Sequence, residues 1–170
     1  MTLDEFVQIL ETHFAPKARD ITRFASTGYS FEEWFNWELF SAFTARAFGC
    51  LPKPGYKAHF AEHAAAQLGD LVIRAKDETP WLVETSLVHK FTQSKWKAKI
   101  TEDRAKLQGA VGEGVRKVQL MVLCSDVETD LQGKWGYWFE EMPFWPTPDA
   151  KLCLGDGELG EVCLLLWEVA

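Results

Sequence analysis

Two apolar runs separated by a lysine-rich stretch constrain the fold of this chain more than any other feature. Residues 81–88 and 118–124 are rich in aliphatic and β-branched side chains, and each predicts a buried strand. The stretch between them, 93–109, has apolar residues at helical spacing and ends in a cluster of glycines, so it predicts a long helix. A strand, a helix and a strand in this order indicate a sheet that is covered by helices.

The N-terminal part of the chain predicts helices. Residues 3–14 show helical spacing of apolar side chains, and Pro16 is expected to end that helix, so 17–29 is interpreted as a polar connection. Ser30 and Glu33 have the spacing of a capping box, which predicts the start of a second, aromatic-rich helix.

Further strands complete an α/β pattern. Residues 71–73 predict a strand that forms a hairpin with the first apolar run, and 136–140 and 161–169 are the later strand candidates. The segment 56–68 is compatible with either helix or strand. We therefore expect a single α/β domain over 1–170, with a mixed β-sheet flanked by helices, helices at the N-terminus and a β-hairpin at the C-terminus.

The composition places the chain among soluble globular proteins. With 170 residues, 47% of them hydrophobic, it can bury the core of one domain. Its apolar runs are shorter than the roughly 20 residues that span a bilayer, and its first residues lack a signal pattern. We expect a cytoplasmic protein without a membrane partner, in which the cysteines are reduced and mostly buried: Cys50, Cys124, Cys153 and Cys163. Cys153 and Cys163 could face each other across a hairpin, but a cytosolic compartment disfavours a disulfide.

Two carboxylates stand out against the predicted hairpin. Asp70 precedes one strand and Glu84 interrupts the next, so the hairpin brings both toward one end of the sheet, with Glu84 and Ser86 on the same face. A buried carboxylate is costly unless it meets a cation or a donor. Two such groups suit Mg²⁺ or Mn²⁺, which take oxygen ligands. Structural alternatives are that Asp70 ends a turn and that Glu84 pairs with Lys95 or Arg74.

The order of these motifs resembles that of a known family. A helix with an internal glutamate (36–40), a strand after Asp70, a strand with Glu84 and a lysine-rich helix with Asp-x-x-Lys-Leu (103–107) follow one another. In this order the chain is similar to the PD-(D/E)XK nuclease superfamily over a core of about 30–140. The resemblance implies a restriction-endonuclease-like fold and Mg²⁺-dependent cleavage of DNA.

The resemblance also implies roles for individual residues. Asp70 and Glu84 match the metal-binding acids of the family. Glu38 matches the helical acid that often completes the metal site, and Glu33 is the alternative for that role. All three acids, Glu38, Asp70 and Glu84, are thus expected at a catalytic metal centre.

The chain departs from the family pattern at one decisive position. The family places a lysine two residues after the glutamate of the strand, where this chain has Ser86. Lys90 shares that face but lies about 20 Å along the strand from the glutamate. Lys95 and Lys99 of the following helix are the candidates to replace the missing cation. Asp103 interrupts the apolar stripe of that helix, and we expect it to cap a loop or hydrogen-bond a neighbouring strand.

Two function classes therefore stay open. One is a Mg²⁺-dependent DNA endonuclease or phosphodiesterase with an atypical active site. The other is a catalytically degenerate relative that binds nucleic acid without cleavage, or a protein partner in an immunity, inhibitor or assembly role. The basic segment 90–106 would contact DNA, and the acidic, Trp-rich residues 118–170, with ten acidic and two basic groups, would contact a protein partner. The pattern His-x-x-Glu-His at 59–63 matches a zinc motif without an identifiable third ligand.

Overall fold

The chain forms helices first and a sheet afterwards. The computed structural model describes residues 1–56, 68–74, 79–89, 91, 93–110, 114–125, 141–155 and 160–170. The elements follow the chain in the order α1 (Leu3–Phe14), the 3-10 turn η1 (Ala15–Lys17), α2 (Ala18–Thr27), α3 (Glu32–Thr44), β1 (Gly49–Pro52), β2 (Leu71–Arg74), β3 (Trp81–His89), α5 (Gln93–Gly109), β4 (Arg116–Ser125), β5 (Ala150–Leu154) and β6 (Glu161–Glu168).

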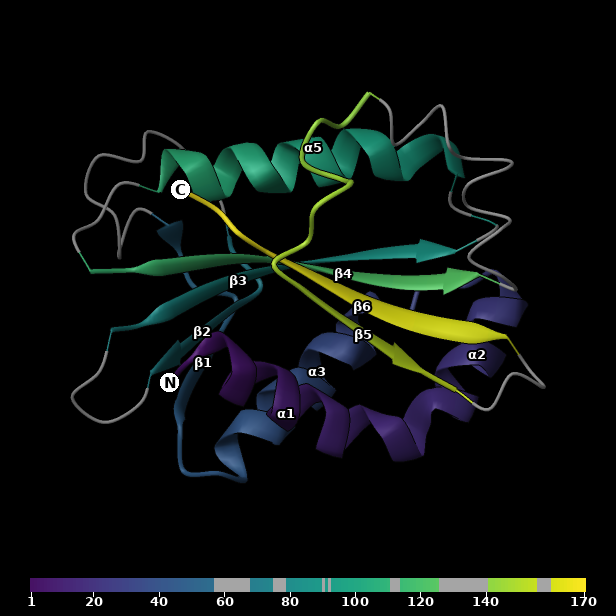
Figure 1. The fold of residues 1–170 in the computed structure, drawn as a ribbon, viewed down its shortest axis with the longest axis horizontal. Helices are drawn as coiled ribbons and strands as arrows, with labels where there is room; N and C mark the ends of the chain where they lie inside the picture. The colour runs from purple at the N-terminus through teal and green to yellow at the C-terminus, as the bar shows by residue number, and fades with distance from the viewer. Residues whose placement is uncertain are drawn as a thin grey trace.

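The strands form one mixed sheet in the order β1-β2-β3-β4-β6-β5. Strands β3 and β4 are parallel, and helix α5 makes the crossover that a parallel pair requires. The other neighbours are antiparallel, including the C-terminal pair β5 and β6. Helix α5 covers one face of the sheet, and α1, α2 and α3 cover the other (Figure 1). The α/β architecture with a helix-flanked mixed sheet is thus confirmed.

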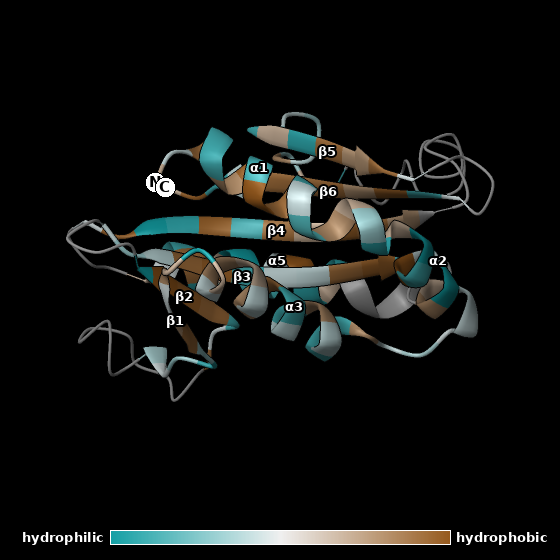
Figure 2. Ribbon diagram, turned by 90° about the horizontal axis from the view of Figure 1, so that it is seen from below, coloured by the Kyte–Doolittle hydropathy of each residue, from teal (hydrophilic) through white to brown (hydrophobic). Residues whose placement is uncertain are grey.

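The main hydrophobic core lies between the sheet and the N-terminal helices. Phe6 of α1 stacks on Trp81 of β3 at 5.2 Å between ring centroids, and Phe14 stacks on Phe35 of α3 at 4.4 Å. All nine residues of β3 are buried because helices cover both of its faces. Figure 2 shows this as hydrophobic colour along the central strands, with more polar colour on the helices.

Helix α1 has the predicted bounds and ends before Pro16, but the prediction of a polar connection over 17–29 is wrong. The proline lies in η1, and α2 continues directly from it over residues interpreted as a polar connection. Proline is tolerated in the first turn of a helix, because its missing N–H has no intrahelical partner there. Helix α2 is polar overall and its buried face is narrow, so its residues resembled a connection; the buried members are Ala18, Ile21 and Ala25.

The capping box expected at Ser30 and Glu33 is also wrong. Helix α3 begins at Glu32 with Phe31 at the N-cap position, where no side chain caps the helix, and Glu33 instead pairs with Lys53 of the β1 end at 2.9 Å. Phe31 is buried, so packing rather than capping positions this helix start.

The central elements match the predictions closely. Strand β2 pairs with β3 in an antiparallel hairpin, α5 has the expected bounds, and β4 and β6 cover the expected C-terminal strands. The short strands β1 and β5 at the two sheet edges are additions to the prediction. The strand candidate 136–140 and the zinc-like motif 59–63 lie outside the described residues. None of the described helices is long and apolar enough to cross a membrane.

The prediction of reduced cysteines is wrong for one pair. Cys153 of β5 and Cys163 of β6 are direct register partners, with their Cα atoms 4.2 Å apart, and they form a disulfide. Antiparallel pairing brings opposite Cβ atoms to within about 5 Å, so the two cysteines do face each other across a hairpin, and the bond differs from the prediction that was based on a cytosolic compartment. Cys50 and Cys124 are free thiols, and Cys124 is buried.

Candidate active site

The candidate site lies where the pairing of β2 with β3 ends. The described pairing between these strands ends at Leu71 opposite Val83, so the next part of β3 has an open edge on that side. The backbone N–H of Thr85 donates to Asp70 Oδ2 at 2.7 Å, and Lys99 Nζ donates to the Thr85 carbonyl at 3.1 Å. The N–H and C=O of one strand residue point to the same side. Asp70 and Lys99 thus form hydrogen bonds with the backbone N–H and C=O of Thr85, and these bonds hold both side chains in place.

Glu84 and Ser86 lie on the face of β3 that α5 covers, as the alternation of side chains predicted. The Tyr56 hydroxyl donates a hydrogen bond to Glu84 Oε1. That oxygen lies 3.3 Å from the position a Cβ atom would take on Gly69, so the close approach depends on a glycine there. Burial and the neighbouring Asp70 raise the pKa of Glu84 to about 8, against the effect of the Tyr56 hydrogen bond.

Asp103 organises the cations of the site. Its side chain is fully buried, and it accepts a hydrogen bond from the Ser86 hydroxyl at 2.9 Å. Lys99 Nζ lies 2.7 Å from Asp103 Oδ2, and Lys106 Nζ lies 2.9 Å from Oδ1. The expectation that Asp103 hydrogen-bonds a neighbouring strand is confirmed, and its charge holds two lysines in place.

Lys99 of α5 places a cation next to Ser86 of β3. Its ammonium contacts Thr85, which precedes Ser86, and the same Asp103 oxygen that Ser86 contacts. Burial opposes its charged form, but attraction to Asp103 and Glu32 outweighs that effect and raises the pKa of Lys99. Lys99 is therefore charged at neutral pH. The side chain of Lys95, the other candidate, lies outside the described part, as does Lys90.

Glu32 is the acid that sequence reasoning missed. It is the first residue of α3, and its Oε1 lies 3.3 Å from Lys99 Nζ. Its Oε2 is buried and has no hydrogen-bond partner among the described residues. Burial raises the pKa of Glu32, and the charges of Asp70 and Asp103 add to this, while Lys99 opposes it. Glu32 thus belongs to the same group of charges as Lys99, Asp70 and Asp103.

Glu38 lies elsewhere, which corrects the expectation that it completes the metal site. Its Oε2 is 2.7 Å from His13 Nε2 and 3.3 Å from Lys17 Nζ, both in the N-terminal helical region. Burial opposes ionisation, but hydrogen bonds from these two partners outweigh it and lower the pKa of Glu38. Glu38 lies six residues after Glu32 on α3. On an α-helix this separates the two side chains by about 240° around the axis and about 9 Å along it, so they face different neighbours.

Asp70, Glu84 and Glu32 are the residues that could hold a metal ion. Burial raises the pKa of Asp70, partly offset by its bond from Thr85 N–H. Their oxygens are not mutually close enough to form a compact cage; among the described residues, the group with all ligand atoms within 4.8 Å is Glu161 with the β5–β6 disulfide pair. Mg²⁺ keeps several waters and needs only one or two carboxylates, so Asp70 and Glu84 offer the type of ligand atom that this ion takes.

A cleft opens from the carboxylates toward solvent. It has a volume of about 490 Å³, and its walls are formed by α3 and by the chain around β1 and Asp70. The lining includes Glu32, Asn36, Trp37, Pro52, Lys53 and Asp70. Two of the candidate ligands thus face a space that is large enough for a small-molecule group.

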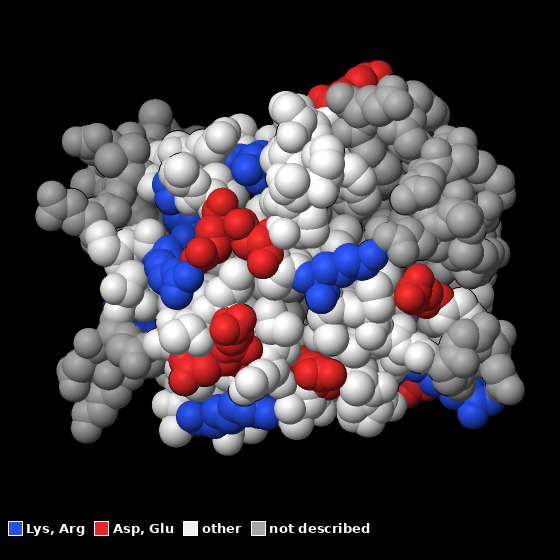
Figure 3. Space-filling model, in the orientation of Figure 1, with Lys and Arg blue, Asp and Glu red and all other residues white. Residues whose placement is uncertain are grey.

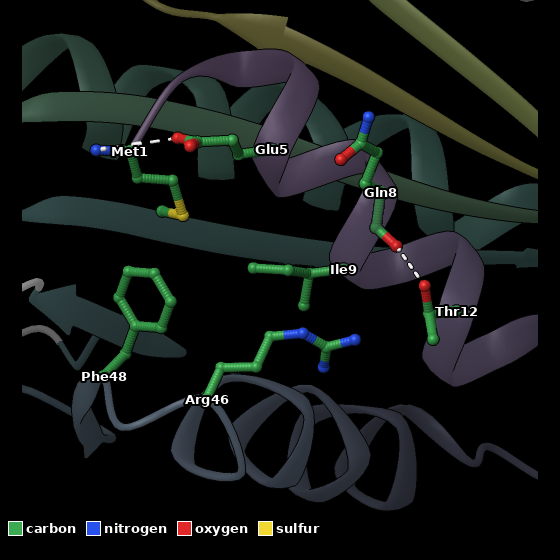
Figure 4. A pocket seen from close by; sticks show the side chains of 7 residues that line it. All are labelled: Met1, Glu5, Gln8, Ile9, Thr12, Arg46 and Phe48. Carbon is green, nitrogen blue, oxygen red and sulfur yellow. Dashed lines mark hydrogen bonds and ion pairs between the residues drawn. The ribbon is translucent and has the colours of Figure 1, made fainter.

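A second cavity lies away from this cluster. It has a volume of about 350 Å³ and lies between α1 and the chain after α3. Figure 4 shows Glu5 beside the N-terminal amine of Met1, and Arg46 opposite them from the end of α3. Its polar groups are partly satisfied within the protein, for example Thr12 with the Gln8 carbonyl at 2.8 Å.

The basic segment 90–106 does not present a row of exposed cations in its described part. Each described basic side chain there has an intramolecular partner: Lys97 pairs with Glu141, Lys99 and Lys106 pair with Asp103, and Arg104 lies over the Phe144 ring. On the face drawn in Figure 3, basic and acidic side chains are interspersed. The structure therefore does not support a DNA surface formed by this segment.

The tryptophans described in the C-terminal third pack internally. Trp145 and Trp167 lie 5.8 Å apart between ring centroids, and Trp167 Nε1 donates to the Phe144 carbonyl at 2.9 Å. These two rings stabilise the face of β6 that lies on the α5 side of the sheet. Trp135 and Trp138 lie outside the described residues.

Comparison of the chain with protein-family models, curated proteins and solved structures found no match. Function is therefore inferred from the geometry of this site.

Proposed function

We propose that the protein is a metal-dependent phosphodiesterase of the PD-(D/E)XK type, in which a lysine from α5 replaces the lysine of the family motif. The observation that carries the proposal is the position of Lys99. Its ammonium lies 3.1 Å from the carbonyl of Thr85, the residue next to Glu84, and it shares Asp103 with Ser86. A permanent cation at the acidic end of the hairpin is the feature that Ser86 alone cannot supply.

The arrangement of elements supports the same proposal. Helix α3, the strands β1, β2 and β3, helix α5 and strand β4 follow in that order and form neighbouring parts of one sheet and its two covering layers. Asp70 immediately precedes β2 and Glu84 lies within β3, as the family resemblance requires. The helical acid is present too, at Glu32 rather than at Glu38.

The residues of the chain have distinct roles in this proposal. Asp70 and Glu84 would hold Mg²⁺ or Mn²⁺, and such an ion would supply charge that polarises a phosphate and lowers the pKa of a bound water. Lys99 stabilises the negative charge that develops on the phosphoryl oxygens, because a fixed cation in a partly buried site acts strongly there. The buried, unpartnered Oε2 of Glu32 accepts a proton from the attacking water, for which a raised carboxyl pKa is suited.

One observation favours the alternative, binding without cleavage. The Glu84 carboxylate accepts a hydrogen bond from Tyr56, and Lys99 is held by both Asp103 and Glu32. In this alternative these contacts are purely structural, and the scaffold binds nucleic acid or a protein partner. Metal binding distinguishes the two proposals, because the structural alternative needs no ion.

Nicking of supercoiled plasmid with Mg²⁺ or Mn²⁺ tests the proposal. Asp70→Asn and Glu84→Gln preserve side-chain size and remove the charged ligands, and we expect each to lower the cleavage rate by about 100-fold or more. Glu38→Gln is the matched control, since this acid contacts His13 and Lys17, and it should retain the wild-type rate.

Two outcomes would contradict the phosphodiesterase. One is wild-type cleavage by Asp70→Asn, which would indicate a contaminating nuclease. The other is a wild-type protein that neither nicks DNA nor gains thermal stability with Mg²⁺ or Mn²⁺, which would favour the binding alternative.

A further inference from the structure

The cleft beside Asp70 differs from the rest of the described surface in carrying an exposed indole. The Trp37 side chain on α3 is 52% exposed, and its ring is braced edge-on by Phe40 at 5.6 Å between centroids. A large aromatic group left in water next to a concave space is typical of a binding surface. A flat π-face on a rigid helix suits a flat aromatic ligand.

Two residues that line the same cleft carry polar atoms without a hydrogen-bond partner in the described part of the chain. Asn36 Oδ1 and Glu32 Oε2 are buried and unbonded among the described residues, and both side chains line the cleft. A buried polar atom without a partner is costly, so each is expected to meet a ligand or water. An amide offers both an acceptor and donors, which match the edge of a nucleobase.

The charge of the cleft excludes a phosphate as its main occupant. Glu32, Glu33 and Asp70 line it, whereas the one lysine of the lining, Lys53, already pairs with Glu33 at 2.9 Å. An uncharged, planar group is accepted more readily than an anion in such surroundings. Lys53 is 64% exposed at its side chain and lies where it can contact the backbone of a strand that enters the cleft.

We propose that this cleft binds an unpaired nucleobase, stacked on Trp37 and hydrogen-bonded by Asn36. This inference rests on the proposed phosphodiesterase and names its substrate class: single-stranded nucleic acid, or an unpaired end or flap. Because Asp70 and Glu32 belong both to the cleft and to the candidate metal site, the bound base adjoins the phosphate that is cut. A base within a continuous duplex is stacked and paired, and must be flipped out before it can enter.

Binding of fluorescein-labelled oligonucleotides in the absence of divalent ions tests the cleft separately from cleavage. By fluorescence anisotropy we expect the wild type to bind a single strand at least several-fold more tightly than the matching duplex. Trp37→Ala should weaken binding of the single strand roughly tenfold, and Trp37→Phe, which keeps an aromatic face, should weaken it much less. Tyr29→Ala is the control, because Tyr29 is 80% exposed and does not line the cleft.

The possible results separate the cleft from the chemistry. Equal binding by wild type and Trp37→Ala, or equal affinity for single strand and duplex, would overturn the proposal that the cleft binds a nucleobase. If nicking depends on Asp70 but Trp37→Ala leaves binding unchanged, the nucleobase proposal is wrong and the phosphodiesterase proposal stands. If single strands bind in a Trp37-dependent way and no cleavage occurs, the nucleobase proposal is supported and the phosphodiesterase proposal is wrong. Thermal melting of each variant confirms that it is folded.

Discussion

The ammonium of Lys99 and the carboxylate of Asp70 both bond to the backbone of Thr85, at 3.1 Å and 2.7 Å. This backbone edge is open because β2 begins one residue after Asp70. A strand edge without a neighbouring strand needs hydrogen-bond partners, and here side chains of opposite charge supply them. At the scale of single residues, the site is therefore built on one unpaired peptide edge.

Replacing Lys99 tests whether this cation acts in catalysis. We expect Lys99→Ala to lower the cleavage rate by about 100-fold, because the developing phosphoryl charge loses its cation. Adding Ser86→Lys to that variant returns an ammonium to the same side of Asp103 and should restore part of the rate. Lys97→Ala is the control, since Lys97 pairs with Glu141. If the double variant is as inactive as Lys99→Ala and has an unchanged melting temperature, the proposal that Lys99 replaces the lysine missing at position 86 is contradicted.

At the scale of elements, the junction between α2 and α3 determines where Glu32 lies. Gly28 ends α2 with φ of +77°, in the left-handed region that favours glycine. A Cβ atom at this position would lie 3.3 Å from the Phe91 ring, just beyond the end of β3. The turn therefore brings the start of α3 close to the chain that follows β3.

Alanine substitutions at two glycines separate backbone strain from this contact. Gly114 has a similar φ of +74° but open space around it, so Gly114→Ala should lower the free energy of unfolding by about 1 kcal/mol. Gly28→Ala has the same strain and must also displace Phe91, so it should cost more. Urea denaturation measures both. Equal losses in the two variants would show that the Phe91 ring moves aside without cost.

At the scale of the whole molecule, the fold concentrates buried acids at one place between its layers. Burial raises the pKa of Glu32, Asp70 and Glu84; the charge of Asp70 adds to this for Glu32 and Glu84, and the charge of Asp103 adds to it for all three acids. The half-buried Lys99 and Lys106 offset only part of this repulsion. The metal-free protein thus bears an electrostatic cost that depends on pH and that a divalent cation would relieve.

The stability of the metal-free protein should accordingly fall as pH rises. The pKa of Glu84 is 4.5 ordinarily and about 8 in the folded chain, so the folded state binds its proton more tightly. Its contribution is fully present below pH 4.5 and is lost as the pH rises to about 8, with a slope of at most about 1.4 kcal/mol per pH unit. Glu84→Gln should flatten this dependence in thermal melts. Stabilisation by Mg²⁺ should increase over the same range, because the ion needs the ionised carboxylate.

How well an element could be predicted from the sequence depended on how much of it is buried. The strand 81–88 was recognised because both of its faces are packed and its residues are almost all apolar. The helix 93–109 was recognised from the apolar residues of its packed side and from the glycines after it. Strand β1 has only four residues with alternating exposure, which is too short for a clear pattern. Helix α2 buries only a narrow face and is polar overall, so its residues resembled a connection.

The candidate site was foreseen in the same uneven way. Asp70, Glu84 and Lys99 were singled out because each stands out against its neighbours, and the structure brings them together. Glu32 and Glu38 lie on the same aromatic-rich helix, and local sequence does not say which of them faces the hairpin. The packing of that helix against the sheet decides the choice, and it places Glu32 beside Lys99 and Glu38 beside His13 and Lys17.

Local patterning alone thus determined the central strands, the crossover helix and the pair of acids on the hairpin, because alternation and helical period are written in neighbouring residues. Tertiary structure decided which helical acid joins them, that α5 directs Lys99 to the Thr85 edge, and that Cys153 meets Cys163 across β5 and β6. These outcomes depend on how distant segments rotate and pair in space, and no short window of sequence contains that information.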